Sequence, residues 1–202
     1  MFRDFGGPCE NRNNGDAVAR YDHLPNRWLI VMPIFSRIPV GPNEPSVGRS
    51  GEPVNTTADG SGVRWYEFRV GETAARSLRV HQHGTYAPDG FERWMASPAM
   101  DAKGNIGVGY SFGGTPNFAG QRLAARLAGR SVGLWTLRET TLVEGAASQT
   151  NTLRWEDYTQ TAVDPSDDCT IWYVGDYLKQ GATNYSSRIG AIRMPGCAEA
   201  RR

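Results

Sequence analysis

Three segments of the chain share one pattern of hydrophobic and polar positions. Each has a short β-type run that ends at an aspartate, about four turn-forming residues and a second β-rich run. The segments are 17–31, 99–111 and 161–174, and the aspartates are Asp22, Asp101 and Asp164. An aspartate suits this place because its carboxylate can accept hydrogen bonds from backbone amides inside the turn. Each segment is therefore predicted to be a β-hairpin.

The spacing of these hairpins indicates a repeat without deciding the architecture. The aspartates lie 79 and 63 residues apart. Propeller blades repeat about every 40 to 50 residues, so each spacing allows one blade with long loops. An antiparallel meander in a β-sandwich would reuse the same hairpins, and the spacing alone leaves both architectures open.

Three further segments complete the expected organisation. The interval 36–62 contains four prolines and no β-periodicity, so we interpret it as a linker or as a place where ordered blades are absent. Alternation resumes over 63–69, which predicts a strand. The interval 118–130 has helix-forming leucines and alanines, with Arg122 and Arg126 four residues apart. Glycines bracket only about two turns there, so we favour a strand over a helix.

Composition narrows the function classes. Among 202 residues, 24 glycines and 12 prolines disfavour a helix-rich fold, while 10% aromatics supply a core. A net charge of +1 gives no field that would recruit nucleic acid or an anionic membrane. The longest apolar run, 29–32, stops at Pro33, so no membrane span is expected. The first eight residues lack the apolar stretch of a secretory signal, and none is expected in this chain.

An ordered series of short motifs runs through the second half of the chain. Its members are HGTYAPD at 83–89, RWMAS at 93–97, the stretch 99–106, SQT at 148–150, RWEDY at 154–158, the stretch 163–173, RIG at 188–190 and PGC at 195–197. Related motifs occur at 6–9, 15–16, 21–28 and 62–67. Together they resemble a family of large secreted bacterial β-propeller proteins that are distantly sialidase-like.

The resemblance implies an all-β fold, a shortened or partial propeller of about three antiparallel blades. Family members carry additional blades between the motifs at Trp28 and Trp65, where this chain has the proline-rich stretch. Glu156 stands where the family has a glycine. The implied division is a first-blade remnant at 1–35, a linker at 36–62, further blades at 63–197 and a disordered tail at 198–202. A secreted or cell-surface location follows from the resemblance.

The three cysteines allow one disulfide. Cys169 stands at the head of a strand and Cys197 closes the last one. A bridge between them would hold the last strand to its neighbour, worth roughly 3 kcal/mol. The alternative is two buried thiols in a reducing compartment. Cys9 is then left over, and its partner would lie in the absent blades.

Two clusters contain metal-ligand residue types. Asp164, Asp167 and Asp168 could hold Ca²⁺, but capping of a turn explains them more simply. His81 and His83 share one face of a strand and lack an evident third ligand. We therefore expect no cofactor, with Ca²⁺ as the alternative.

One stretch has the composition of a sugar-binding site. It combines guanidinium, aromatic and carboxylate groups in Arg154, Trp155, Asp157 and Tyr158. A sialidase needs an arginine cluster and a tyrosine nucleophile beside a glutamate. Tyr158, Glu156 and the arginines Arg64, Arg93 and Arg154 could be assigned to these roles, but their spacing in the sequence does not place them together.

We therefore expect a non-catalytic scaffold or binding module of a secreted bacterial protein, with a carbohydrate or protein ligand. The alternatives are a degenerate or partial glycoside hydrolase of sialidase type and a remnant with no selected function. An incomplete propeller leaves open strand edges and exposed apolar faces, so self-association or aggregation is expected.

Overall fold

β-Strands form all the regular structure that the computed structural model describes, over residues 17–22, 27–34, 61–71, 77–134, 137–151, 155 and 158–197. The strands group into three antiparallel sheets. This arrangement confirms the expected all-β class. The described residues include no helix long and apolar enough to cross a membrane.

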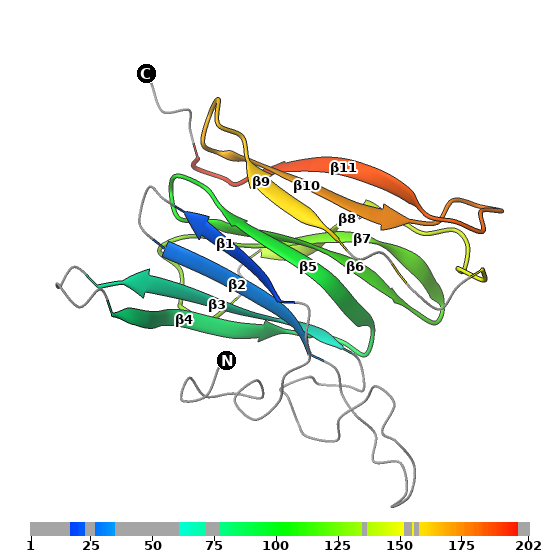
Figure 1. Cartoon of the computed structure of the whole chain (residues 1–202), viewed down its shortest axis with the longest axis horizontal. Coiled ribbons are helices and arrows are strands. Elements are labelled where there is room, and N and C mark those ends of the chain that lie inside the picture. The colour runs from blue at the N-terminus through cyan, green and yellow to red at the C-terminus, as the bar shows by residue number, and fades with distance from the viewer. Residues whose placement is uncertain are drawn as a thin grey trace, which may run out of the picture.

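Each sheet is a meander in which neighbouring strands are consecutive in sequence (Figure 1). Sheet A contains β1 (Val18–Asp22), β2 (Arg27–Ile34), β3 (Gly62–Val70) and β4 (Leu78–Tyr86). Sheet B contains β5 (Glu92–Met100), β6 (Ile106–Gly114), β7 (Asn117–Arg126) and β8 (Leu137–Val143). Sheet C contains β9 (Gln160–Val163), β10 (Thr170–Tyr177) and β11 (Ser186–Arg193).

The three predicted hairpins are confirmed, and each opens one sheet. They are the pairs β1–β2, β5–β6 and β9–β10. The strand expected over 63–69 is β3, and it is buried on both faces as far as Phe68. The segment 118–130 is also mainly a strand, because β7 pairs with β6 on one side and β8 on the other. Two hydrogen-bonded neighbours and full burial over 120–126 override its helical propensity.

The strand before the proline-rich stretch and the strand after it belong to one sheet. β2 pairs with β3 in antiparallel register, with Trp28 opposite Phe68 and Val31 opposite Trp65. The stretch therefore connects two neighbouring strands of sheet A. Its residues 36–60, the tail 198–202 and Cys9 lie outside the described residues.

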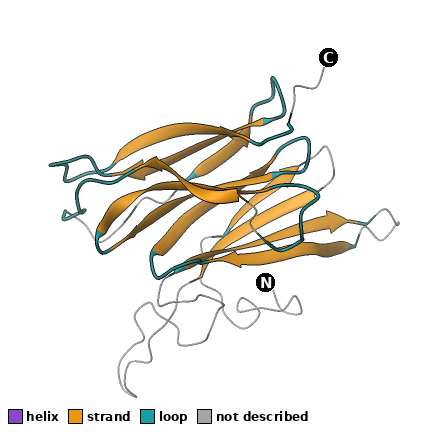
Figure 2. Cartoon of the chain, turned by 180° about the vertical axis from the view of Figure 1, so that it is seen from behind, coloured by secondary structure: helices purple, strands orange, loops and turns teal. Residues whose placement is uncertain are grey.

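The sheets stack face to face, with sheet B in the middle (Figure 2). Between sheets A and B the core includes Leu29, Val31, Ile106 and Val108. Between sheets B and C a second core is built from Ala99, Ala125, Ile171 and Met194. The described stack does not close into a ring (Figure 1).

The predicted disulfide is confirmed. Cys169, which directly precedes β10, is bonded to Cys197, which follows β11. Both residues are buried. The bridge fastens the end of the last described strand to the start of its neighbour.

Candidate functional site

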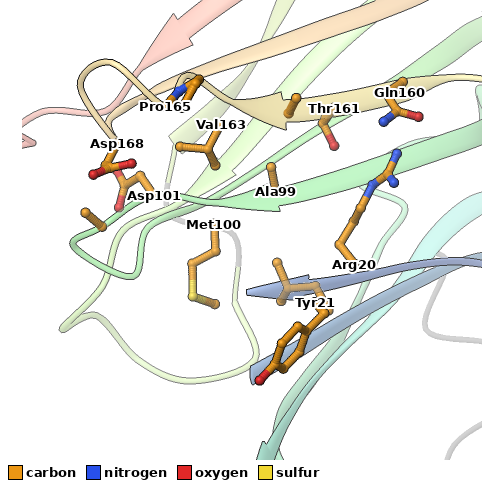
Figure 3. Close-up of a pocket in the computed structure, with 13 residues that line it drawn as sticks. Arg20, Tyr21, Ala99, Met100, Asp101, Gln160, Thr161, Val163, Pro165 and Asp168 are labelled. Atoms are coloured by element: carbon orange, nitrogen blue, oxygen red, sulfur yellow. The ribbon is translucent and has the colours of Figure 1, made fainter. Parts of the chain in front are cut away.

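A pocket lies where the first strands of the three sheets come together. β5 packs against β1 on one side and against β9 on the other. The ends of these strands and the turns that follow surround a cavity of about 330 Å³ (Figure 3). This volume lies within the usual range for small-molecule sites, about 300–1,000 Å³.

The pocket is lined by corresponding positions of the three hairpins. The residues that immediately precede the repeated aspartates are Tyr21, Met100 and Val163, and all three line it. The positions one residue earlier, Arg20, Ala99 and Ala162, line it as well. The repeat in the sequence therefore becomes one shared cavity in space.

Arg20 is the positively charged residue among the pocket-lining side chains. It is partly buried and extends from β1 towards Gln160 and Thr161 of β9 (Figure 3). Its Nε atom is buried without a hydrogen-bond partner. A buried donor without a partner costs about 1–3 kcal/mol, so this guanidinium is suited to a ligand that supplies an acceptor.

The wall opposite Arg20 is held in place by the turn between β5 and β6. Buried Asp101 accepts hydrogen bonds from the backbone amides of Lys103 and Asn105, both at 2.9 Å, and from Asn105 Nδ2 at 2.7 Å. The Ala102 amide donates to the Asp168 carbonyl at 2.8 Å, which joins this turn to the β9–β10 turn. The carboxylate of Asp101 is therefore used to shape the turn.

Two of the three aspartates in the β9–β10 turn are also engaged in capping, and the third, Asp168, lines the pocket. Asp164 accepts hydrogen bonds from the Ser166 amide and hydroxyl and from Trp172 Nε1. Asp167 accepts from the amides of Cys169 and Thr170 and from the Thr170 hydroxyl. The hydrogen bonds from Thr170 contribute most to lowering the pKa of Asp167 to about 2.

These contacts favour the capping interpretation of the aspartate cluster over a Ca²⁺ site. Within the described residues, no three His, Cys, Asp or Glu side chains gather in a way that could hold a metal ion. His81 and His83 are exposed on β4, and His83 Nδ1 faces Arg64 Nη2. Partial burial, followed by the charge of Arg64, lowers the pKa of His83.

The two sugar-site candidates that the structure describes, Trp155 and Tyr158, are not among the residues that line the pocket. Trp155 is partly buried; its indole donates to Ser111 Oγ at 3.2 Å, and its ring centroid lies 5.9 Å from that of Trp94. Tyr158 is 89% exposed. Arg154 and Asp157 fall outside the described residues, as does Glu156. Trp155 therefore packs into an aromatic cluster between sheets B and C, while the Tyr158 ring lies in solvent.

A second group of charged and aromatic residues lies between sheets A and B. Arg93, which is 0% exposed, donates to Glu139 at 2.8 Å and to Asp89 at 2.7 Å. The Tyr110 hydroxyl donates to the same Glu139 carboxylate at 2.7 Å. Burial, followed by the nearby Glu139 charge, raises the pKa of Tyr110.

This group combines tyrosine, glutamate and arginine, but Arg93 and Tyr110 are closed off from solvent. Arg64, another arginine considered for a sialidase role, instead donates to Thr85 Oγ1 at 3.0 Å. The arrangement stabilises the packing of the two sheets and presents no open face to a substrate.

Reasoning from sequence did not find the pocket. The signal was present in the positions just before Asp22, Asp101 and Asp164, which the repeat itself makes equivalent. Their closeness depends on how the sheets stack, which spacing along the chain does not specify. In comparisons with protein-family models, curated proteins and solved structures, no match to the chain was found.

Proposed function

We propose that the chain is a non-catalytic binding module on a propeller-type scaffold, and that its pocket binds a small acidic carbohydrate. The observation that carries this proposal is Arg20, whose buried Nε has no hydrogen-bond partner and which lines a cavity shared by three repeats. Buried Nε atoms without a hydrogen-bond partner also occur at Arg64 and Arg126, and Arg20 is the one of these three arginines that lines the pocket.

The arrangement of the sheets supports the propeller-type scaffold. A propeller blade is an antiparallel meander that packs face to face on the next blade, around a common axis. Here three meanders pack face to face, and their first strands, β1, β5 and β9, lie next to one another. Ligand binding where the first strands meet suits such a scaffold, because every blade then contributes to one site.

The chemistry of the pocket around Arg20 supports an acidic sugar, while Asp101 and Asp168 line the part of the pocket farther from Arg20 (Figure 3). An arginine presents parallel N–H donors that match the two oxygens of a carboxylate. Ala99, Met100 and Val163 supply apolar walls. The Cys169–Cys197 disulfide is typical of oxidising surroundings, which fits a secreted or surface-exposed binding protein.

Calorimetric titration with uronic acids, N-acetylneuraminic acid and neutral hexoses tests this proposal. We expect the acidic sugars to bind and the neutral ones to bind at least tenfold more weakly. Arg20→Met keeps an apolar stem of similar length and should abolish binding. Arg79→Met, at an exposed position of β4 that does not line the pocket, is the matched control and should leave binding unchanged.

Two results would overturn the proposal. One is equal affinity of the wild-type chain and the Arg20→Met variant for every sugar that binds, or no binding at all. The other is turnover of a fluorogenic sialoside that Tyr158→Phe removes, which would establish the sialidase-type alternative. Circular dichroism of each variant confirms that loss of binding is not loss of fold.

A further inference from the structure

The three sheets stack in the same orientation, each using one face towards the sheet before it and the opposite face towards the sheet after it. Trp28 of β2, Ile106 of β6 and Ile171 of β10 occupy equivalent positions, because each pairs with the residue that precedes the aspartate of its hairpin. These partners are Tyr21, Met100 and Val163. Ile106 faces sheet A, and Ile171 faces sheet B. Trp28, their equivalent in sheet A, lies on the outer face of the stack and is 38% exposed.

The opposite face follows the same rule. Leu29 of sheet A packs towards sheet B, and its equivalent Gly107 of sheet B packs towards sheet C. A Cβ atom at Gly107 would lie 2.9 Å from Ile192 Cδ1 of β11. The equivalent residue of sheet C is Trp172, which therefore points away from the stack and is 43% exposed.

Within the chain, the face that one sheet turns towards the following sheet packs on the face that the following sheet turns back towards it, once between sheets A and B and once between sheets B and C. The outer faces of sheets A and C are the remaining members of these two kinds of face, and they are therefore expected to be complementary. On sheet A, Trp28 and Ile30 have the β1 register partners Tyr21 and Ala19, none of them charged. Their β3 partners, Phe68 and Tyr66, are buried, so the open part of this face is the β1–β2 part. On sheet C, the cross-strand neighbours of Trp172 and Val174 include Ala162, Ala191 and Ile189, also uncharged. Ile189 is 66% exposed and Tyr21 is 49% exposed.

We propose that a second copy of the chain docks head to tail, with the outer face of its sheet A at β1–β2 on the outer face of sheet C of the first copy. This contact would continue the A-on-B and B-on-C stacking already established within each chain. The two faces differ, so the contact is heterologous and repeats until a ring closes or a linear series forms. The small net charge of +1 opposes association only weakly.

Mixed variants test the head-to-tail arrangement. Trp28→Arg places a charge on the sheet A face only, and Trp172→Arg places one on the sheet C face only. Trp28 does not line the pocket, but its ring lies 4.9 Å from that of Tyr21, which does, so association is measured without added sugar. Phe118→Arg, at a 45% exposed aromatic on β7, is the matched control.

Light scattering coupled to size exclusion is measured from about 1 µM to about 1 mM chain. We expect the average mass of the wild type and of Phe118→Arg to rise above one chain with concentration. Each tryptophan variant alone should stay at one chain. An equal mixture of the two variants should form a one-to-one pair and nothing larger, because it retains one intact contact.

Three results would overturn the proposal. The first is a wild-type chain that stays monomeric throughout. The second is association that persists in either tryptophan variant, which would indicate a symmetric or non-specific contact. The third is a mixture that remains monomeric while the wild type associates. Far-ultraviolet circular dichroism of both variants verifies that the exposed substitutions leave the sheets intact.

Discussion

The ring of Tyr173 occupies the space that any side chain at Gly109 would need. A Cβ atom built on Gly109 would overlap the Cδ2 and Cγ atoms of Tyr173. Tyr173 belongs to sheet C and is 1% exposed, while Gly109 lies on the face of sheet B that receives sheet C. The missing side chain on β6 is therefore what lets the third sheet pack closely.

Gly109→Ala should destabilise the fold. The added methyl group cannot fit unless the Tyr173 ring and its strand move, and overpacking of this kind typically costs about 1–3 kcal/mol. Urea unfolding followed by tryptophan fluorescence measures the change. Gly71→Ala is the control, because its nearest contact is the rotatable Ser77 hydroxyl at 3.2 Å. Equal stability of the two variants would contradict the close packing of sheet C on β6.

Arg93→Met should be destabilising, although the side chains are similar in length. Arg93 is fully buried and is the cation that faces both Glu139 and Asp89. Without Arg93, Glu139 keeps the Tyr110 hydroxyl and Arg122 at 3.8 Å, and Asp89 is 40% exposed, so the cost should fall between about 1 kcal/mol for a surface pair and about 3–5 kcal/mol for a fully buried one. Arg79→Met, at an exposed position of β4, is the control and should change stability by under about 0.5 kcal/mol. Thermal unfolding of both variants compares them, and a loss at Arg79 as large as that at Arg93 would contradict this prediction.

Stability should fall at acid pH partly through Asp167. Its folded pKa of about 2 lies below the ordinary value of 3.8, so ionised Asp167 favours the folded state. Its contribution is present above about pH 4 and is lost as the pH falls through about 2. Thr170→Val removes the hydroxyl donor and should raise the pKa of Asp167, which carbon-13 NMR titration of the carboxyl group measures. An unchanged pKa in Thr170→Val would show that the hydroxyl has no such effect.

Loss of the disulfide should weaken the fold without changing its topology. Cys169 and Cys197 are 28 residues apart, and closing a loop of that length stabilises by about 3–4 kcal/mol on the chain-entropy account. The double variant Cys169→Ala with Cys197→Ala should unfold at correspondingly lower urea. Cys9→Ala provides a comparison in which a cysteine is removed and the bridge is kept. A double variant as stable as the wild type would mean that the bridge adds no stability.

The sequence predicted the β-hairpins because their signals are local. Alternating side chains, a capping aspartate and a four-residue turn act within about fifteen residues, so Asp101 and Asp164 could be assigned to turns without knowledge of the rest. The 118–130 segment was harder, because its leucines and alanines favour a helix. The pairing of β7 with strands on both sides decides that case, and such pairing is non-local.

The sequence by itself determined that this protein is built from β-hairpins, and that Cys169 and Cys197 could hold its last strand. Only the tertiary structure decided that β2 and β3 share a sheet, that Gly109 receives Tyr173, and that Arg20 lines a pocket with β5 and β9. The physical reason is that turns and alternation depend on neighbouring residues. The pocket and the exposed end faces instead depend on which sheet faces pack together, and this is set by side-chain shape across distant strands.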